Sequence, residues 1–176
     1  MPYPGYLKTD PNMPSSGLIL NLGSGKDRRD GCVNADIRDD VGADWVMDIC
    51  KPVPKREFSK IIANDVLEHL PDLVAAMTNC RDMLEMSGEM HIHVPYDLSL
   101  GAWQDPTHVR AFNEKSWIYY CEWSWYLGWK DTRFQLAHLE CRLSEYGESL
   151  ELEQDELLRT PRAVDSMYVV LRKIPV

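Results

Sequence analysis

Short apolar runs alternate with polar stretches through the first part of the chain. The first run covers residues 18–22, and three more follow at 32–37, 44–49 and 59–65. Runs of this length, bounded by glycine, proline and aspartate, are typical of strands that are buried on both faces in a parallel sheet. The pattern therefore predicts four strands in succession, joined by crossover connections.

One segment after these runs has a clear helical period. The apolar positions that recur on one face of it are Leu73, Met77, Cys80 and Leu84. Asp72 suits the positive start of this helix, which is predicted over 71–88, and Gly88 is expected to end it. Residues 89–95 then alternate at a period of two, which predicts a fifth strand.

The second half of the chain differs in composition, because it is rich in aromatic residues. Five of the six tryptophans lie in 96–130, where 113–123 looks helical with Asn113 as a cap. Residues 132–145 and 166–175 are extended in character and predict a terminal antiparallel pair, joined by an acidic excursion. Strands that alternate with crossovers define an α/β fold with a mostly parallel sheet and helices on both faces.

The length of 176 residues indicates one domain, with residues 1–17 as an irregular arm and 18–176 as the domain itself. The link between the first two strands has only about nine residues, so a short turn or a loop is expected in place of a crossover helix. Within the domain, 96–130 forms a distinct aromatic-rich insertion.

The charge of the chain excludes some functions. A net charge of −9 argues against nucleic-acid binding, because affinity for a phosphate backbone depends on lysine and arginine. The N-terminus lacks a basic start followed by an apolar stretch, and no apolar run approaches the length of a membrane span. We therefore expect a cytoplasmic protein that does not insert in a membrane.

Metal-binding patterns are weak in this sequence. The five cysteines are scattered and show no CxxC spacing, so a disulfide framework or zinc site is not expected. His91 and His93 share one face of the fifth strand, but no third ligand accompanies them in the sequence. We interpret this pair as part of a polar strand face and predict no metal site.

Small and acidic residues stand where the first three strands end. Gly23, Ser24 and Gly25 follow the first strand, Asp36 ends the second and Asp48 ends the third. Ligands of parallel sheets bind outside the carboxyl ends of the strands. Asp36 is placed to accept hydrogen bonds from ribose hydroxyls, and Asp48 from an adenine amino group.

Two nucleotide classes fit such an edge. A dinucleotide site needs GxGxxG, but the third glycine position is Arg28, and the acid comes earlier than about 20 residues onward. An adenosyl ligand without phosphates needs neither feature, which points to S-adenosylmethionine. A nicotinamide-dependent oxidoreductase is the less favoured alternative.

At this point the chain resembles the class I, Rossmann-like, S-adenosylmethionine-dependent methyltransferases, and within them the small-molecule branch. The matching segments are "LNLGSG", "VNADI", "WVMDI", "IIANDVLEHLPD", "GEMHIHVPYD" and "DPTHVRAFNEKSW". The resemblance implies seven strands in the order 3-2-1-4-5-7-6 with an antiparallel terminal strand. It also implies methyl transfer to a small-molecule acceptor, with S-adenosyl-L-homocysteine as the product.

The resemblance and the strand ends together assign candidate site residues. Those expected at the cofactor are Asn21, Gly23, Ser24, Gly25, Asp36, Ile37, Asp48, Ile49, Asn64, Asp65 and His69. A general base is needed only if the acceptor loses a proton during transfer, and the catalytic candidates for that role are His108, Asp105 and Tyr96. A histidine that merely fixes its loop is the alternative for His69 and His108.

Two questions stay open at this stage. The family usually has an acid in place of Asn21, and its third glycine is absent, so a cofactor-binding or scaffold protein without turnover is an alternative to an active enzyme. The aromatic residues of 96–130 suit a lid or acceptor pocket, and equally a hydrophobic skin on the sheet edge or a homodimer contact.

Overall fold

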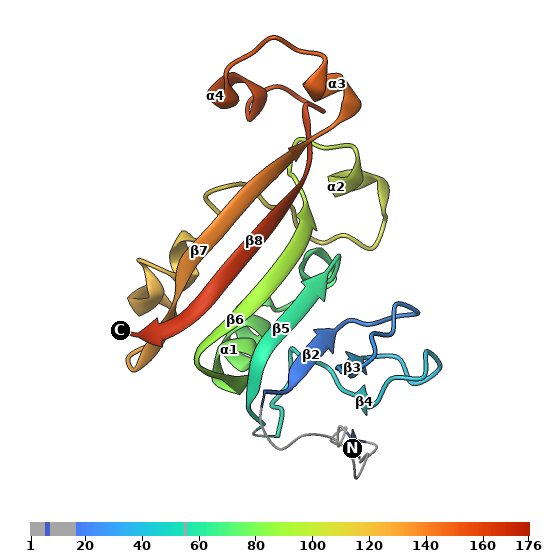
Figure 1. The fold of residues 1–176 in the computed structure, drawn as a ribbon, viewed down its shortest axis with the longest axis vertical. Coiled ribbons are helices and arrows are strands. Elements are labelled where there is room, and N and C mark those ends of the chain that lie inside the picture. The colour runs from blue at the N-terminus through green and yellow to red at the C-terminus, as the bar shows by residue number, and fades with distance from the viewer. Residues whose placement is uncertain (1–5, 8–16, 55) are drawn as a thin grey trace.

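A computed structural model describes residues 6–7, 17–54 and 56–176, and these form one eight-stranded sheet with helices and turns around it (Figure 1). The strands are β1 (Tyr6–Leu7), β2 (Ile19–Leu22), β3 (Val33–Asp36), β4 (Trp45–Val46), β5 (Phe58–Asn64), β6 (Leu84–Pro95), β7 (Thr132–Leu143) and β8 (Val164–Pro175). The helices are α1 (Leu73–Met83), α2 (Gly101–Gln104), α3 (Glu145–Glu148) and α4 (Gln154–Leu157), and the 3-10 turns are η1 (Leu67–His69), η2 (Ile118–Tyr120) and η3 (Ser124–Leu127).

The strand order is β1-β4-β3-β2-β5-β6-β8-β7. Neighbouring strands from β4 to β6 are parallel, whereas β8 runs antiparallel between β6 and β7. Numbered without β1, the seven strands follow the order 3-2-1-4-5-7-6. The predicted α/β class with a mostly parallel sheet, the strand order and the terminal antiparallel pair are therefore confirmed.

The arm of the chain, predicted over 1–17, lies largely outside the described residues, which exclude 1–5 and 8–16. Within it, Tyr6–Leu7 forms β1 and pairs antiparallel with β4, which adds an eighth strand to the sheet. No helix in the described part of the chain is long and apolar enough to cross a membrane.

The hydrophobic core lies between the sheet and α1, which is behind the sheet in Figure 1 and contacts β6 and β7. Asp72 caps α1, since its carboxylate accepts a hydrogen bond from the Ala75 amide at 2.9 Å. The helix ends at Met83, five residues before the predicted Gly88. The expectation fails because Leu84, which is only 1% exposed, already pairs with Phe58 as the start of β6.

The prediction of an α-helix over 113–123 is also wrong. The described backbone forms hydrogen-bonded turns and the single 3-10 turn η2, while Asn113 accepts a hydrogen bond from the Lys115 amide at 3.0 Å. Trp117 and Tyr120 are buried in the core behind the sheet. Burial of these large rings fixes an irregular path that helical propensity alone does not favour.

The face of the sheet opposite α1 is covered by fewer helices than the sequence predicted. A loop connects β2 and β3 in place of a crossover helix, as the short link implied. It is held by Asn21, whose amide donates to the Asp27 carbonyl at 2.8 Å and to Asn34 Oδ1 at 3.0 Å. Farther along this face, half-buried His91 and Tyr168 border a cavity of about 240 Å³. Among the described residues, the expected helical layer is thus found on the α1 side.

Replacing Asn21 by alanine is expected to destabilise the protein. The side chain is 3% exposed and makes two hydrogen bonds that anchor the β2–β3 loop, so its loss should cost about 1–2 kcal/mol. Urea unfolding followed by circular dichroism measures this cost. An unchanged unfolding midpoint would show that the loop is held by other contacts.

Candidate active site

The glycine turn after β2 has two different glycines. Gly23 (φ +64°) packs against Val66, and a Cβ atom on Gly23 would overlap the Val66 side chain. Gly25 (φ +47°) has open space where its Cβ would lie. Both positions need the left-handed backbone that glycine tolerates best. Gly23 thus has a packing reason of its own, while Gly25 leaves room at the carboxyl edge of the sheet.

Asp36 ties this turn to the end of β3. One carboxylate oxygen accepts from the Gly25 amide at 2.8 Å, and the other accepts from the Arg38 amide at 2.9 Å. A carboxylate offers about four acceptor positions, so two remain after these bonds. Asp36 is 8% exposed, so only a small part of it is open to a further partner.

The predicted adenine contacts differ in their exposure. Asp48 is half-buried and one of its oxygens accepts from the Cys50 amide at 2.9 Å. Ile37 is 64% exposed beside Asp36, and is free to cover a planar ring. Ile49 is 4% exposed and belongs to the hydrophobic core, so its side chain packs inside the protein and not at the surface of the edge.

The remaining predicted cofactor residues lie at the ends of β2 and β5. The Ser24 hydroxyl is buried and has no hydrogen-bond partner among the described residues. Asn64 lines the cavity on the less covered face, and an Asp65 carboxylate oxygen is hydrogen-bonded to His93 Nδ1 at 2.8 Å. Asn21 is occupied by the loop contacts given above, which leaves its predicted cofactor role as a prediction.

A second group of polar side chains gathers at the carboxyl ends of β5 and β6. They surround a cavity of about 250 Å³ lined by Asp65, Glu68, His69, Pro95, Gly101, Gln104, Asp105 and His108. η1 supplies two of these residues, and the loop after α2 supplies two more. The two segments are joined by the Val109 amide, which donates to the Glu68 carbonyl at 2.9 Å.

Glu68 is the least expected member of this group. It is 1% exposed, and neither carboxylate oxygen makes a hydrogen bond to a described residue. Burial raises the pKa of Glu68 to about 7, because the charged form loses its hydration. A buried carboxylate without a partner at a cavity is a strong candidate for a functional group.

The two histidines beside Glu68 are held by hydrogen bonds from their Nδ1 atoms. His108 Nδ1 lies 2.9 Å from the Ala102 carbonyl, to which it must donate. The Thr107 hydroxyl donates to Asp105 at 2.7 Å, so it must accept from His69 Nδ1 at 2.9 Å. These contacts assign both Nδ1 atoms as donors, so Nε2 is the atom of each ring that is left to accept a proton or bind a ligand.

The structure separates the three predicted catalytic residues. His108 and Asp105 lie at the cavity, with 3.9 Å between His108 Nε2 and an Asp105 oxygen. Hydrogen bonds from Thr107 hold the pKa of Asp105 below its usual value. Tyr96 does not line this cavity: its hydroxyl is 2.9 Å from Glu114 and 3.0 Å from the Leu158 carbonyl, and burial raises its pKa. A base role for Tyr96 therefore has no support from its surroundings.

The aromatic-rich insertion divides into two parts. Its first part carries α2 and the loop to His108, and it lines the cavity just described. Its second part packs behind the sheet, where the Trp129 indole donates to the Thr78 hydroxyl at 3.1 Å and lies under Arg81. The core packing of Trp117, Tyr120 and Trp129 agrees with the hydrophobic skin, whereas no Trp, Tyr or Phe is among the described residues that line the cavity, so the acceptor-pocket interpretation of the aromatic residues stays a prediction.

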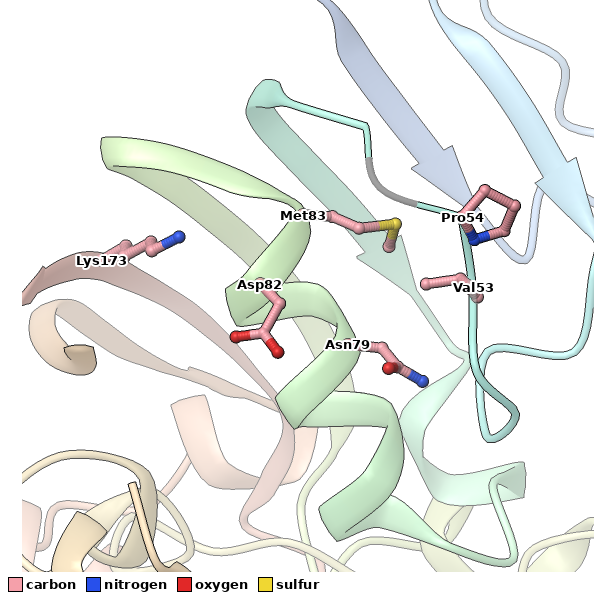
Figure 2. Close-up of a pocket in the computed structure, with 6 residues that line it drawn as sticks. All are labelled: Val53, Pro54, Asn79, Asp82, Met83 and Lys173. Atoms are coloured by element: carbon pink, nitrogen blue, oxygen red, sulfur yellow. The ribbon is translucent and has the colours of Figure 1, made fainter. Parts of the chain in front are cut away.

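A larger cavity of about 390 Å³ lies at the opposite, amino edge of the parallel strands. Figure 2 shows Asn79, Asp82 and Met83 of α1 on one side of it, facing Val53 and Pro54. The polar groups there already have partners: Asn79 donates to two backbone carbonyls, and Asp82 pairs with Arg81 at 2.6 Å. This cavity therefore lacks converging free groups.

Sequence reasoning missed two residues of the candidate site. Thr107 was not singled out, although it joins Asp105 to His69. Glu68 was weighed with His69 near the transferred methyl but not kept among the site residues, because only the fold reveals that this carboxylate is buried without a partner. The available signal was the adjacent pair Glu68-His69 directly after a strand, together with the Asp105-x-x-His108 spacing.

Comparison with known proteins agrees with the topology. No model of a known protein family matches the chain, and no curated protein matches its sequence. A SAM-dependent methyltransferase from Archaeoglobus fulgidus matches with a TM-score of 0.58 at 16% identity, over 92% of this chain and 88% of that one. The N-methyltransferase NodS from Bradyrhizobium japonicum, in complex with S-adenosyl-l-homocysteine, gives 0.54 at 15% identity, over 89% and 77%.

One structural neighbour has a different activity. The 4+2 cyclase SpnF matches with a TM-score of 0.60 at 13% identity, over 97% of this chain and 86% of that chain. At such identities the likeness concerns the fold. The chain has the Rossmann-like fold of the class I S-adenosylmethionine-dependent methyltransferases, which confirms the fold that the sequence resemblance implied.

Proposed function

We propose that this chain is an S-adenosylmethionine-dependent methyltransferase that acts on a small-molecule acceptor. The observation that carries the proposal is the carboxyl edge of the sheet, where the glycine turn, Asp36 and Asp48 follow three adjacent parallel strands. In open α/β sheets this edge is the position of the ligand. The methyltransferase fold of the structural neighbours supports the same assignment.

The residues at this edge fit an adenosyl ligand without phosphates. Asp36 keeps two acceptor positions for ribose hydroxyls, and exposed Ile37 offers an apolar face to the base. The buried Ser24 hydroxyl, which lacks a partner, suits the polar methionine part. When bound, the sulfonium supplies an electrophilic methyl group. The protein then has to orient the acceptor and exclude water, which can account for about 7–11 kcal/mol of a barrier.

The acceptor is proposed to enter the cavity of about 250 Å³ at the ends of β5 and β6. Its volume suits a small molecule better than a polymer segment. His108 Nε2 is free to accept a proton there, since its Nδ1 donates to the Ala102 carbonyl. An acceptor that loses a proton during transfer would find this nitrogen at the cavity wall.

Calorimetry with S-adenosylmethionine and S-adenosylhomocysteine tests the proposal. Replacing Asp36 by asparagine removes the charge from hydrogen bonds worth about 1.5–3 kcal/mol, so affinity should fall tenfold to about a hundredfold. Asp40, exposed in the following loop and paired with Arg38, provides the matched control as Asp40→Asn. Circular dichroism verifies that both variants fold. Equal affinity of Asp36→Asn and the wild type would contradict the assignment.

A second candidate function is cofactor binding without methyl transfer. It is favoured by the cyclase that shares this fold and by Asn21, whose amide is engaged within the protein. Tight binding of S-adenosylmethionine, with no methylated product across a broad screen of small acceptors, would support this candidate. Binding of NADH in place of either adenosyl ligand would instead favour an oxidoreductase.

A further inference from the structure

Three potential metal ligands meet at the wall of the candidate acceptor cavity. One ligand atom from each of Glu68, His69 and His108 lies within 4.8 Å of the others. The rings of His69 and His108 meet edge to face, with 4.6 Å between their centroids. Two histidines and a carboxylate on one side of a cavity form a ligand set that binds Zn²⁺ or a related divalent metal.

The contacts around the histidines are those that orient metal ligands. His108 Nδ1 donates to a backbone carbonyl, and His69 Nδ1 donates to Thr107, which in turn donates to Asp105. In metal sites the ligating histidine holds its second ring nitrogen in this way, which fixes its tautomer and ring direction. Both Nε2 lone pairs are thereby kept free.

Glu68 is an independent indication of a ligand. Its carboxylate is buried, yet it makes no hydrogen bond to any other residue that the structure describes. Such a group is costly unless a cation or proton compensates it. The basic side chains of this cavity wall are the two histidines, with His93 close enough to act on Glu68 as well, and Asp65 and Asp105 add further negative charge. This surrounding field favours a cation over an anion.

The geometry leaves a position open for a further ligand. Tetrahedral zinc with bonds of about 2.0–2.2 Å places its ligand atoms roughly 3.3 Å apart, so modest side-chain rotation closes the observed spacing. We propose that Glu68, His69 and His108 bind one divalent transition-metal ion of the Zn²⁺ type, with its remaining position facing the cavity. This proposal departs from the sequence analysis, which predicted no metal site.

A metal at this position would lower the pKa of a water or acceptor hydroxyl bound to it. The histidines would then act as ligands, and the metal would replace His108 as the group that promotes loss of the proton. The role of the metal in removing a proton from the acceptor rests on the proposed methyl transfer, whereas metal binding itself does not. The experiment therefore measures the metal itself, in the absence of S-adenosylmethionine.

The full chain, treated with a chelator and then dialysed, is titrated with Zn²⁺ and with Co²⁺. We expect one Zn²⁺ per chain by calorimetry, a rise in melting temperature, and visible Co²⁺ absorption of the kind given by low coordination numbers. Mg²⁺, which prefers oxygen ligands, should compete poorly. Glu68→Gln and His108→Gln should each weaken Zn²⁺ binding by more than tenfold.

The strand histidines provide a matched control. A His91→Gln/His138→Gln double variant removes as many imidazoles as the cluster holds, but these two histidines contact Tyr168, Glu89 and Glu140, none of which lines the cavity. It should bind Zn²⁺ as the wild type does. Thr107→Val, which removes an orienting partner of His69, should weaken binding about 10- to 100-fold without changing the stoichiometry.

Two results would overturn the proposal. One is that Zn²⁺ binds Glu68→Gln and the wild type equally well, and the other is that binding is lost only in the double variant. Loss of S-adenosylmethionine binding would leave the metal titration unaffected. Failure of the metal proposal and failure of the proposed function are therefore distinguishable.

Discussion

Replacing Gly23 by alanine is expected to cause the largest loss of stability of any single substitution considered. The new Cβ would overlap the Val66 side chain, in a buried contact between the turn after β2 and the segment after β5. The backbone at φ +64° adds strain for any residue with a side chain. Overpacking and strain cost about 1–3 kcal/mol each, so a loss of roughly 2–5 kcal/mol is expected in urea unfolding.

Gly25 offers a control two residues away. Its φ of +47° is also positive, but its Cβ would meet open space, so Gly25→Ala should cost only about 1–2 kcal/mol. The same methyl group would project at the proposed cofactor edge and should weaken S-adenosylmethionine binding. Adding Val66→Ala to Gly23→Ala should recover part of the lost stability. Equal costs at the two glycines would contradict the packing role assigned to Gly23.

Replacing Glu68 by methionine is expected to stabilise the metal-free protein. Methionine keeps the length of the side chain and removes a buried carboxylate whose oxygens have no hydrogen-bond partner in the described structure. Removal of an unsatisfied buried group is worth about 1–3 kcal/mol. Chelator-treated wild type and Glu68→Met are compared by urea unfolding. A residue that serves binding or catalysis can lower the stability of the protein, so its replacement is expected to raise stability and to reduce function.

Glu89→Met is the matched substitution for this measurement. Glu89 accepts from Arg172 at 2.7 Å and contacts His91 at 3.1 Å, so methionine there leaves its partners unpaired and should not stabilise the protein. Destabilisation by Glu68→Met of more than about 1 kcal/mol would mean that the buried carboxylate has a favourable partner. That result would remove the main reason for treating Glu68 as a functional group.

The strands could be predicted because they depend on local signals, and apolar runs such as 18–22 and 59–65 identified the buried ones. Their order is not a local property, and the family resemblance supplied it. The end of α1 was missed because residues 84–88 keep a helix-compatible pattern. Pairing of Leu84 with Phe58 draws this segment into β6, and such a long-range contact cannot be read from local sequence.

The candidate site was predicted where its residues stand at strand ends. Asp36 is the last residue of β3, and Asp48 comes two residues after the short strand β4. The pairing of Glu68 and His69 with His108 could not be predicted, because it depends on a hydrogen bond between segments 41 residues apart in the chain, Glu68 and Val109. Likewise, burial of Glu68 is a property of the folded cavity and not of its neighbours in sequence.

The fold alone does not decide the reaction, since sites are built on a fold independently of its topology. The 4+2 cyclase among the structural neighbours illustrates this separation. The reaction therefore has to be argued from the side chains of this chain, in which the glycine turn and Asp36 lie at one part of the edge. Glu68, His69 and His108 line the neighbouring cavity.

The central claim is that the carboxyl edge of the sheet binds an adenosyl ligand through Asp36. A crystal structure of the full chain grown with S-adenosylhomocysteine tests it most directly. The account predicts the ribose hydroxyls within hydrogen-bond distance of the Asp36 carboxylate, with the adenine beside Ile37 and Asp48. A ligand bound elsewhere, or an empty edge at saturating S-adenosylhomocysteine, would contradict it.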